Sequence, residues 1–594
     1  MSLSNLSNLL LSQIISDINN NGDIVCLLLT CKDICYNSSL KRSIRFKGIG
    51  PIDTIKGKES KKFNATSTLF KLSSFKDILE NSISHQHVFK PHFIEKEKEG
   101  DGGKDNGSVT TALVHKFCCF GEEDIIKSLA IPSIETLFIE KTFYDVNLNS
   151  VSVLPRLQHL SMNAKDLTLG HHSETLKSLQ LQVNTPYRLA DLGLTKFVCL
   201  TELTFVNNFV SQIGPGLLPS SLTSLTLPLI GIIPRNTFLS LKSLKTLKIH
   251  YEIEKVREQQ RFIDLESLPV LKMLSICDKN DPTIDKSTLS RCPMPQLEKL
   301  CIEQSEFILG RVNLGSCPSI KKLFVFNCLV SMPNIIPSTV EKLTIIKTCF
   351  ENTILEQVVL PPLLTCLTLT RQCAEEVKLP ESLIKLKQYV EKVPLSLPQN
   401  LKKLLLTTYR KNYFENFELP SQYPPNLESL DLSSIPGIYK LDIPPMTKYL
   451  SIIVDRDYDE TQLSFEKMVI DNTPPIFSIG SRIRNSISQP QWLPPTTTHL
   501  DCLIKAMGHK NGVRFRLDER LDPYNRNVLV LETQTLQGGI ISQRKSSTND
   551  QQQQQQQQYD PIYLHFTVDK DSSPYRLNLS FGDNNLKHIM NQPF

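Results

Sequence analysis

Along the middle of this 594-residue chain, apolar and polar residues alternate over short stretches, and most of these stretches follow a proline. The clearest copies read Pro-x-x-Leu-x-x-Leu-x-Leu, as in PSSLTSLTL at 219–227 and PQNLKKLLL at 398–406. Alternation with a period of two predicts a short strand with its leucines on one side and its polar residues on the other. The central leucines of the copies are Leu137, Leu160, Leu179, Leu203, Leu225, Leu247, Leu274, Leu300, Leu323, Leu343, Leu367, Leu386, Leu404, Leu430 and Leu450, and Leu500 marks a weaker copy.

The spacing of the central leucines predicts the architecture. Successive copies up to Leu450 are 18 to 27 residues apart, which is the period of a leucine-rich-repeat solenoid. One such strand cannot bury its apolar side alone, so neighbouring copies must stack into a continuous core. The segments between strands are rich in Pro, Ser and Thr and lack helical periodicity. We therefore expect a repeat solenoid over 130–455, with a curved parallel β-sheet and a mostly non-helical convex side.

The flanking regions have other patterns. Residues 1–46 predict a short α-helical module, and residues 47–129 predict an irregular region whose charged, Gly-rich part at 95–107 should be a flexible loop. Residues 456–594 predict degenerate repeats and a C-terminal cap, with strands at 559–568 and 575–581. The segment 543–558 ends in eight glutamines and predicts a disordered insert.

The first 46 residues carry more apolar side chains than three short helices can bury. Apolar residues recur at helical spacing from Leu6 to Ile18, and a break at 19–22 precedes a second helix that Asp23 can cap. A third short helix is expected over 31–40. Such a module should pack against something else, which is either a partner or the first repeat, because solenoids need capped ends.

The same segment resembles an F-box. The resemblance rests on the run from Leu6 to Ile18, followed by Asp23-Ile24-Val25 and Thr30-Cys31-Lys32; Ser7, Leu9 and Ile34 stand where that family has Pro, Glu and Trp. It implies that the helices dock on the Skp-type adaptor of a cullin–RING ubiquitin ligase. The residues that it implies for adaptor binding are Leu6, Leu10, Leu11, Ile14, Ile15 and Ile18. A functional F-box, a degenerate F-box and plain capping helices all remain open.

The repeats resemble two known kinds. Their Leu-Pro-x-x-Leu-x-x-Leu opening is similar to FNIP repeats, which are often joined to an F-box-like N-terminus, although the Phe-Asn of that family is absent. Ordinary leucine-rich repeats place an Asn or Cys three residues after the third Leu, and only Asn184, Asn208 and Cys328 fit that place. The array is therefore divergent, between FNIP and ordinary leucine-rich repeats.

The outward strand positions carry the candidate binding residues. Solenoids commonly bind partners on the concave face, and the predicted binding residues there are Lys299, Lys322, Phe324, Lys342, Lys385, Lys387 and Lys403. One interpretation is a basic groove for an acidic or phosphorylated protein segment. The other is that lysine fills exposed positions for solubility, since Glu298, Glu341 and Glu428 offset part of the charge.

Composition narrows the function classes. The formal net charge of +5 is small for this length and argues neither for nor against a nucleic-acid partner. Such a partner would require aromatics interleaved with the basic residues, and only Phe324 and Tyr409 qualify, so it is not expected. Fifteen cysteines without an even framework indicate reduced thiols in a cytoplasmic or nuclear protein, and no apolar run is long enough to span a membrane. No catalytic, metal-binding or cofactor-binding motif occurs, so we expect no enzyme, metal or cofactor.

The sequence thus favours a non-catalytic substrate-recognition subunit of an F-box-type ubiquitin ligase. The alternative is a leucine-rich-repeat scaffold with no ubiquitin role, whose N-terminal helices only cap the solenoid. A third class, a repeat protein that regulates an enzyme, would require a positioned arginine beside the strands, and the sequence singles out none.

Overall fold

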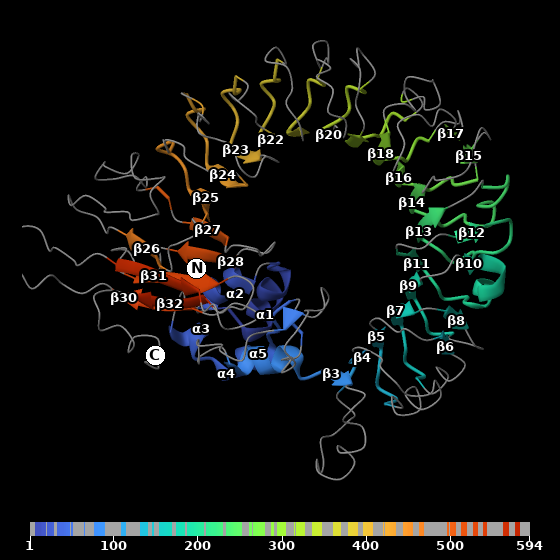
Figure 1. Ribbon diagram of the computed structural model, residues 1–594, viewed down its shortest axis with the longest axis horizontal. Helices are drawn as coiled ribbons and strands as arrows, with labels where there is room; N and C mark the ends of the chain where they lie inside the picture. The colour runs from blue at the N-terminus through green and yellow to red at the C-terminus, as the bar shows by residue number, and fades with distance from the viewer. Residues whose placement is uncertain are drawn as a thin grey trace, which may run out of the picture. The chain divides into compact units, whose positions relative to one another are not determined.

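The structure is a computed structural model. It divides the chain into two compact units, Met1–Ile83 with Leu383–Phe594 and Ser84–Ser382, which are described separately (Figure 1). The described residues are 6–19, 21–28, 32–47, 49–50, 64–65, 76–89, 109–114, 131–139, 145–147, 154–164, 166–168, 174–183, 187–206, 210–229, 233–251, 261–263, 265, 267–278, 287–289, 294–303, 314, 317–326, 336–346, 360–369, 378–389, 396–407, 420, 422–434, 443–455, 462–467, 496–497, 499–505, 513–518, 527–532, 538–542, 562–568 and 577–581.

The predicted fold class is confirmed: the chain is a leucine-rich-repeat-like parallel β-solenoid, and a short α-helical module precedes it in the sequence. The predicted loop at 95–107 and the glutamine-rich segment at 543–558 lie outside the described residues.

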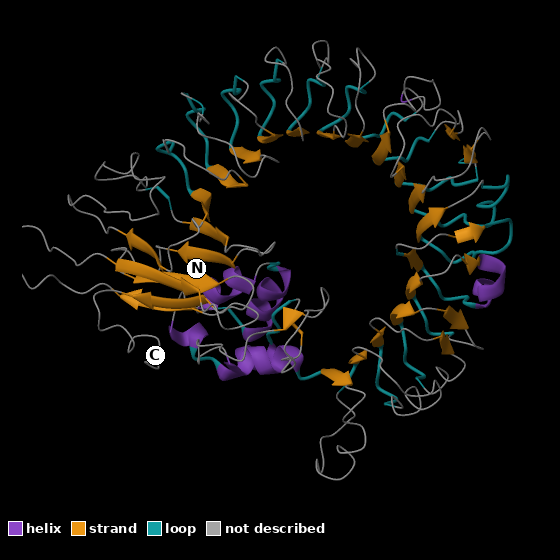
Figure 2. Ribbon diagram, viewed as in Figure 1, coloured by secondary structure: helices purple, strands orange, loops and turns teal. Residues whose placement is uncertain are grey.

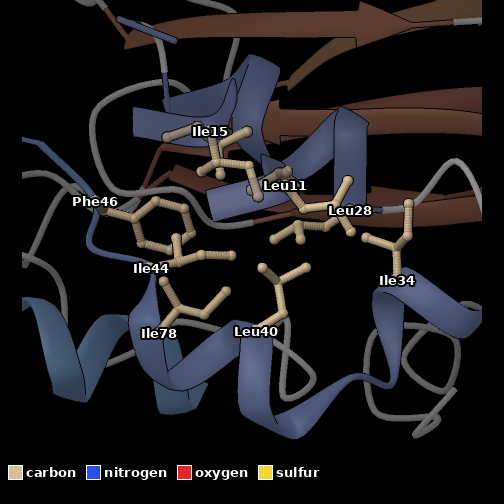
Figure 3. Packing of buried hydrophobic residues seen from close by; sticks show 10 residues of the cluster. Leu11, Ile15, Leu28, Ile34, Leu40, Ile44, Phe46 and Ile78 are labelled. Carbon is tan, nitrogen blue, oxygen red and sulfur yellow. The ribbon is translucent and has the colours of Figure 1, made fainter. Parts of the chain in front are cut away.

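The helical module belongs to the first unit and has its own core. Its helices are α1 (Asn8–Asp17), α2 (Asn21–Leu28), α3 (Lys32–Cys35), α4 (Ser38–Ser43) and α5 (Lys76–Ile83), and a short parallel pair joins β1 (Ile49–Gly50) to β2 (Asn64–Ala65). Figure 3 shows the side chains that converge between the helices. The buried cluster consists of Leu11, Ile15, Ile24, Val25, Leu28, Ile34, Leu40, Ile44, Phe46 and Ile78.

Polar side chains fix helix α5 against the rest of the module. The Asn81 amide donates to the backbone carbonyls of Arg42 and Ile44 at 2.9 and 2.8 Å. The Ser82 hydroxyl accepts the backbone N–H of Phe46 at 2.7 Å. These bonds satisfy the end of α4 and the segment after it, where no further helical turn supplies partners. Residues 76–83 therefore complete the module, although the sequence pattern indicated no helix between 47 and 129.

The second unit is a ladder of parallel strands, each of which pairs with the next. Figure 2 shows these strands along the inner side of an arc, with the return segments on its outer side. The strands are β3 (Gln86–Phe89), β4 (Thr111–Val114), β5 (Thr136–Ile139), β7 (His159–Ala164), β9 (Ser178–Val183), β11 (Glu202–Phe205), β13 (Ser224–Leu229), β14 (Thr246–Tyr251), β16 (Met273–Asp278), β18 (Lys299–Glu303), β19 (Lys322–Phe326), β20 (Lys342–Ile346) and β21 (Cys366–Leu369).

The predicted central leucines lie opposite one another along this ladder. Leu300 faces Leu323, which faces Leu343, which faces Leu367. Across both units, the fifteen central leucines from Leu137 to Leu450 are at most 3% exposed. A slip of one residue would turn every leucine of a strand toward solvent, so burial specifies the register strongly. In β3 and β4 the same position holds His87 and Ala112, which explains why the leucine pattern did not reveal these two strands.

A proline turn opens six repeats among the described residues of the second unit. Each is a four-residue β-turn in which the backbone N–H of the fourth residue donates to the carbonyl of the first. Proline at the second position fixes the φ angle that the turn needs. The prolines at that position are Pro132, Pro155, Pro269, Pro295, Pro318 and Pro362, and the turn bonds measure 3.1 to 3.3 Å. The next buried residue therefore enters the core at the same place in each repeat.

A ladder of Ser and Thr hydroxyls joins successive turns. The hydroxyl residue immediately precedes the buried residue that lies three positions before the central leucine, and it donates to a backbone carbonyl of the repeat before. Such bonds run from Ser133 to Val109, from Thr175 to Leu157, from Ser221 to Leu200, from Thr339 to Ile320 and from Ser382 to Leu364, at 2.6 to 2.9 Å. This ladder satisfies turn carbonyls that lie beside the core, in repeats that mostly lack the Asn or Cys of ordinary leucine-rich repeats.

The return segments of the second unit carry short elements. The described residues there form three parallel strand pairs and two turns of 3-10 helix, and the end of β12 also meets β13 (Figure 1). The elements are β6 (Asp145–Asn147) with β8 (Asp166–Thr168), β10 (Tyr187–Arg188) with β12 (Val210–Gln212), β15 (Arg261–Ile263) with β17 (Ser287–Leu289), and η6 (Leu189–Leu192) and η7 (Leu194–Lys196). The change from η6 to η7 occurs at Gly193, whose φ of 57° favours glycine.

The first unit continues the same repeat and then changes to antiparallel pairing. Leu450 faces Leu500, so the weak copy at Leu500 is confirmed. The strands expected near 559–568 and 575–581 are present as an antiparallel pair. The parallel strands are β22 (Lys385–Tyr389), β23 (Lys403–Thr407), β24 (Ser429–Ser434), β25 (Tyr449–Asp455) and β27 (His499–Lys505); the antiparallel ones are β28 (Val513–Asp518), β29 (Asn527–Glu532) and β30 (Gly538–Ser542), and β26 (Gln462–Lys467), β31 (Ile562–Val568) and β32 (Leu577–Phe581).

Candidate protein-interaction site

Helix α1 begins at a defined cap and presents apolar side chains to solvent. The Ser7 hydroxyl accepts the backbone N–H of Leu10 at 3.3 Å, which is the bond that an N-cap residue supplies to an otherwise unsatisfied donor. Leu9, Leu10 and Ile14 are 80%, 53% and 39% exposed. We call these three residues the α1 face. Large apolar residues grouped on one side of a helix are unusual unless a partner covers them.

The opposite side of α1 holds the helix in the module. Leu11 and Ile15 are each 3% exposed and point toward the buried cluster that includes Leu28 and Leu40 (Figure 3). At the C-terminal end of the helix, the Lys47 ammonium donates to the Ser16 carbonyl at 2.8 Å. A cation at this end also interacts favourably with the helix dipole. The α1 face is therefore presented by a helix fixed at both ends.

The structure divides the six residues implied for adaptor binding. Leu10 and Ile14 are exposed, and Leu6 and Ile18 are half-buried at the edge of the core. Leu11 and Ile15 are core residues of the module, so they position α1 rather than present a surface. Leu9 was not among the six, because the resemblance pairs it with a glutamate. Its place among the apolar residues that recur at helical spacing from Leu6 to Ile18 was the signal that could have identified it.

The second candidate surface lies on the strands of the second unit. Strand pairing places Lys299 opposite Lys322, and Lys322 opposite Lys342. All three side chains are exposed. We call these three residues the lysine row. Met273 precedes the row in the same register and Cys366 follows it, so the run of basic residues is bounded on both sides by uncharged residues.

The next outward position on these strands is uncharged. It holds Cys301, Phe324 and Thr344, which also lie in register and are half-buried. Phe324 thus lies beside the centre of the lysine row, two residues along the strand from Lys322. The predicted binding residues of the second unit are therefore brought together on one face.

The glutamates that the sequence offered as partners for these lysines are engaged elsewhere. Glu298 pairs with Lys272 at 3.3 Å, and Glu341 pairs with Lys321 at 3.9 Å. Both pairs join neighbouring strands at the position immediately before the row. Among the described residues, no ion pair involves the lysine row itself. The pairs are exposed and contribute little to stability. The ion-pair partner of each glutamate is nevertheless a lysine outside the lysine row.

The other predicted lysines belong to the first unit. Lys385 faces Lys403, both exposed, while Lys387 faces Leu405 at the next outward position. The strand that follows, β24, places Ser429 and Asp431 at the corresponding positions. In the same unit, Lys448 pairs with Glu428 at 3.7 Å. This unit therefore holds a second, shorter group of outward lysines.

Reactive and metal-binding groups add no site to these surfaces. Burial raises the pKa of the Cys317 thiol, against a smaller opposing effect of its hydrogen bond with the backbone of Met294. A buried thiol that holds its proton is a poor nucleophile. Within the described residues, no three His, Cys, Asp or Glu side chains gather so that they could hold a metal ion. Nor does any helix among those residues have the length and apolar character to cross a membrane.

Comparisons with known proteins place the chain beside solved leucine-rich-repeat structures. The crystal structure of CroV588, a circular leucine-rich-repeat protein, is 17% identical over 72% of this chain and 80% of that one, with a TM-score of 0.33. The Drosophila Toll–Spatzle complex gives 13% identity over 62% of this chain and 50% of that one, with a TM-score of 0.33. The functional domain of InlJ from Listeria monocytogenes gives 11% identity over 73% of this chain and 85% of that one, with a TM-score of 0.27.

These likenesses are too weak to carry function, and the fold assignment depends on the strand register described above. The chain matches no protein-family model. No curated protein matches it either.

Proposed function

We propose that this protein is a non-catalytic protein-interaction protein that recruits a substrate to a ubiquitin ligase. Its helical module would dock on the Skp-type adaptor of a cullin–RING ligase, and its solenoid would recognise the protein to be modified. In this role the protein accelerates ubiquitin transfer only by positioning, because it holds the substrate near a conjugating enzyme that the ligase binds.

The α1 face is the observation that carries the proposal. Leu10 and Ile14 are four positions apart and lie one above the other on the helix, which is the spacing by which a helix fills an apolar groove. Covering such side chains is favourable by about 25 cal/mol for each Å² of apolar surface removed from water. The resemblance of residues 6–32 to an F-box names the partner class. The buried side of α1 supports the proposal further, since the module core leaves the α1 face free for docking.

The alternative is a leucine-rich-repeat scaffold without a ubiquitin role, in which the helices only cap the solenoid. The two readings differ in what the α1 face contacts. In the first it contacts another protein, and in the second it contacts the chain's own repeats.

A co-purification of the full-length protein with a recombinant Skp-type adaptor separates these readings. The test variant is Leu10→Asp with Ile14→Asp. Leu10 is the third residue of α1, where an aspartate is favourable to the helix dipole, so we expect the helix to persist. The matched control is Val198→Asp with Leu239→Asp, which makes the same change at two residues of the second unit that are 65% and 51% exposed.

We expect the adaptor to bind the parent protein and the control, and not the test variant, with the thermal transition of the repeats unchanged in all three. Absence of adaptor binding by the parent protein would contradict the adaptor role. A lower transition temperature of the repeats in the test variant alone would favour the capping role.

A further inference from the structure

Three like charges stand side by side in the lysine row. Neighbouring strands are about 4.8 Å apart, so Lys299, Lys322 and Lys342 emerge from the sheet in a line about 10 Å long. Like charges directly opposite each other on neighbouring strands are destabilising. Exposed strand positions accept many residue types without this repulsion, and the same register holds Ser224 and Thr246 earlier in the unit.

The ion pairs beside the lysine row show that the neighbouring register position carries balanced charge. At the preceding position, the side chains alternate as Lys272, Glu298, Lys321 and Glu341, and the two ion pairs there leave no net charge. One residue further along the same four strands, the register holds Met273 and then three cations, Lys299, Lys322 and Lys342. Balanced and unbalanced charge thus occur at adjacent register positions of one ladder, and a general need for solubility does not distinguish the two positions.

The neighbouring side chains indicate what kind of anion fits. Arginine forks are the groups that bind a phosphate or a single carboxylate in two-pronged fashion, and the six positions of the row and of its neighbours Cys301, Phe324 and Thr344 contain none. Lysines act as separate point charges on flexible stems. A line of them suits several carboxylates spread along a chain. The half-buried Phe324 beside the centre of the row adds an apolar surface for the stems of glutamate side chains.

We propose that the lysine row binds an extended acidic segment of a partner protein, rich in Asp and Glu. A line about 10 Å long corresponds to three or four residues of extended chain, at about 3.3 Å per residue. The carboxylates of this stretch lie over the ammonium groups, and the repulsion within the row is relieved on binding. This proposal does not depend on the adaptor role of α1, because it concerns other residues and another partner.

The test is a fluorescence-anisotropy titration of the full-length protein with a labelled twelve-residue Asp/Glu-rich peptide. A peptide with Asn and Gln in place of Asp and Glu is the neutral control. The test variant is Lys322→Glu, at the centre of the row. The charge-matched control variant is Lys196→Glu, an exposed lysine of η7 in the same unit, on a return segment rather than on the ladder strands.

We expect the acidic peptide to bind, the neutral peptide not to bind, and Lys322→Glu to weaken binding at least about tenfold, with Lys196→Glu within about twofold of the parent. Equal weakening by both variants would overturn the proposal, because net charge alone would then explain binding. Tighter binding of a singly phosphorylated peptide or of a single-stranded oligonucleotide of equal charge would overturn the choice of an acidic segment.

Discussion

Helix α1 and the strands of the second unit use apolar residues in different ways. On the strands, apolar side chains alternate with outward ones, and the inward leucines are nearly all removed from solvent. On α1, two apolar residues enter the core while Leu9, Leu10 and Ile14 remain exposed. Among the described residues of the second unit, the exposed large apolar side chains are Val198, Leu239 and Leu363, and none of them lies on a strand.

The difference shows where each region can gain free energy from a partner. The strands have already buried their apolar residues by stacking, so their outward face can select a partner chiefly through charge and hydrogen bonding. The helix retains apolar surface and can gain from the hydrophobic effect on binding. The two partner contacts that we propose therefore differ in their physical basis.

The sharpest test of this comparison replaces two neighbouring leucines of α1 by alanine, one in each of two variants. Leu11→Ala should destabilise the module by about 2–5 kcal/mol, because it leaves a cavity in the buried cluster. Leu10→Ala should change stability by less than about 0.5 kcal/mol, since that side chain is already half in water. The measurement is hydrogen exchange of the α1 and α2 amides by mass spectrometry. Equal losses of protection in both variants would show that the α1 face is not a free surface.

A smaller effect is expected where the solenoid depends on hydroxyl groups. Ser221→Ala removes the bond to the Leu200 carbonyl, which measures 2.7 Å, and should cost about 1 kcal/mol because the carbonyl loses its partner beside the core. Ser220→Ala is the matched control, since Ser220 is exposed. Urea unfolding followed by fluorescence compares the two. A cost no greater than that of the control would mean that water satisfies the carbonyl equally well.

The solenoid was predictable from the sequence because one rule repeats along the chain. Leucine at every second strand position and a period near that of one repeat determine both the register and the face of each residue, so the lysine row also followed from the pattern. Strands β3 and β4 were not predicted by the leucine pattern because His87 and Ala112 occupy the central leucine position. The ladder of Ser and Thr hydroxyls could not be predicted because Ser and Thr are common in loops. Only the strand register shows to which carbonyl each hydroxyl donates.

The helical module was predictable only in part. Helical spacing indicated α1, but the sequence alone did not separate its buried side from its exposed side, since both carry leucine and isoleucine. The contribution of α5 depends on Asn81, Ser82 and Ile78 meeting residues that lie more than thirty positions earlier. Contacts over such a separation, outside a repeat, leave no periodic pattern in the sequence.

The smallest effect concerns the strain within the lysine row when no partner is bound. Lys322→Gln removes the central charge, so it relieves repulsion with both Lys299 and Lys342 and should stabilise the solenoid by a few tenths of a kcal/mol at low ionic strength. Salt screens exposed charges, so raising the concentration of NaCl should stabilise the parent protein more than the variant. Thermal unfolding in low and high salt measures both effects, and Lys196→Gln controls for the loss of one positive charge. A variant that is no more stable than this control at low salt would show that the flexible lysine stems already hold the ammonium groups apart, and the row would then have no repulsion for an acidic partner to relieve.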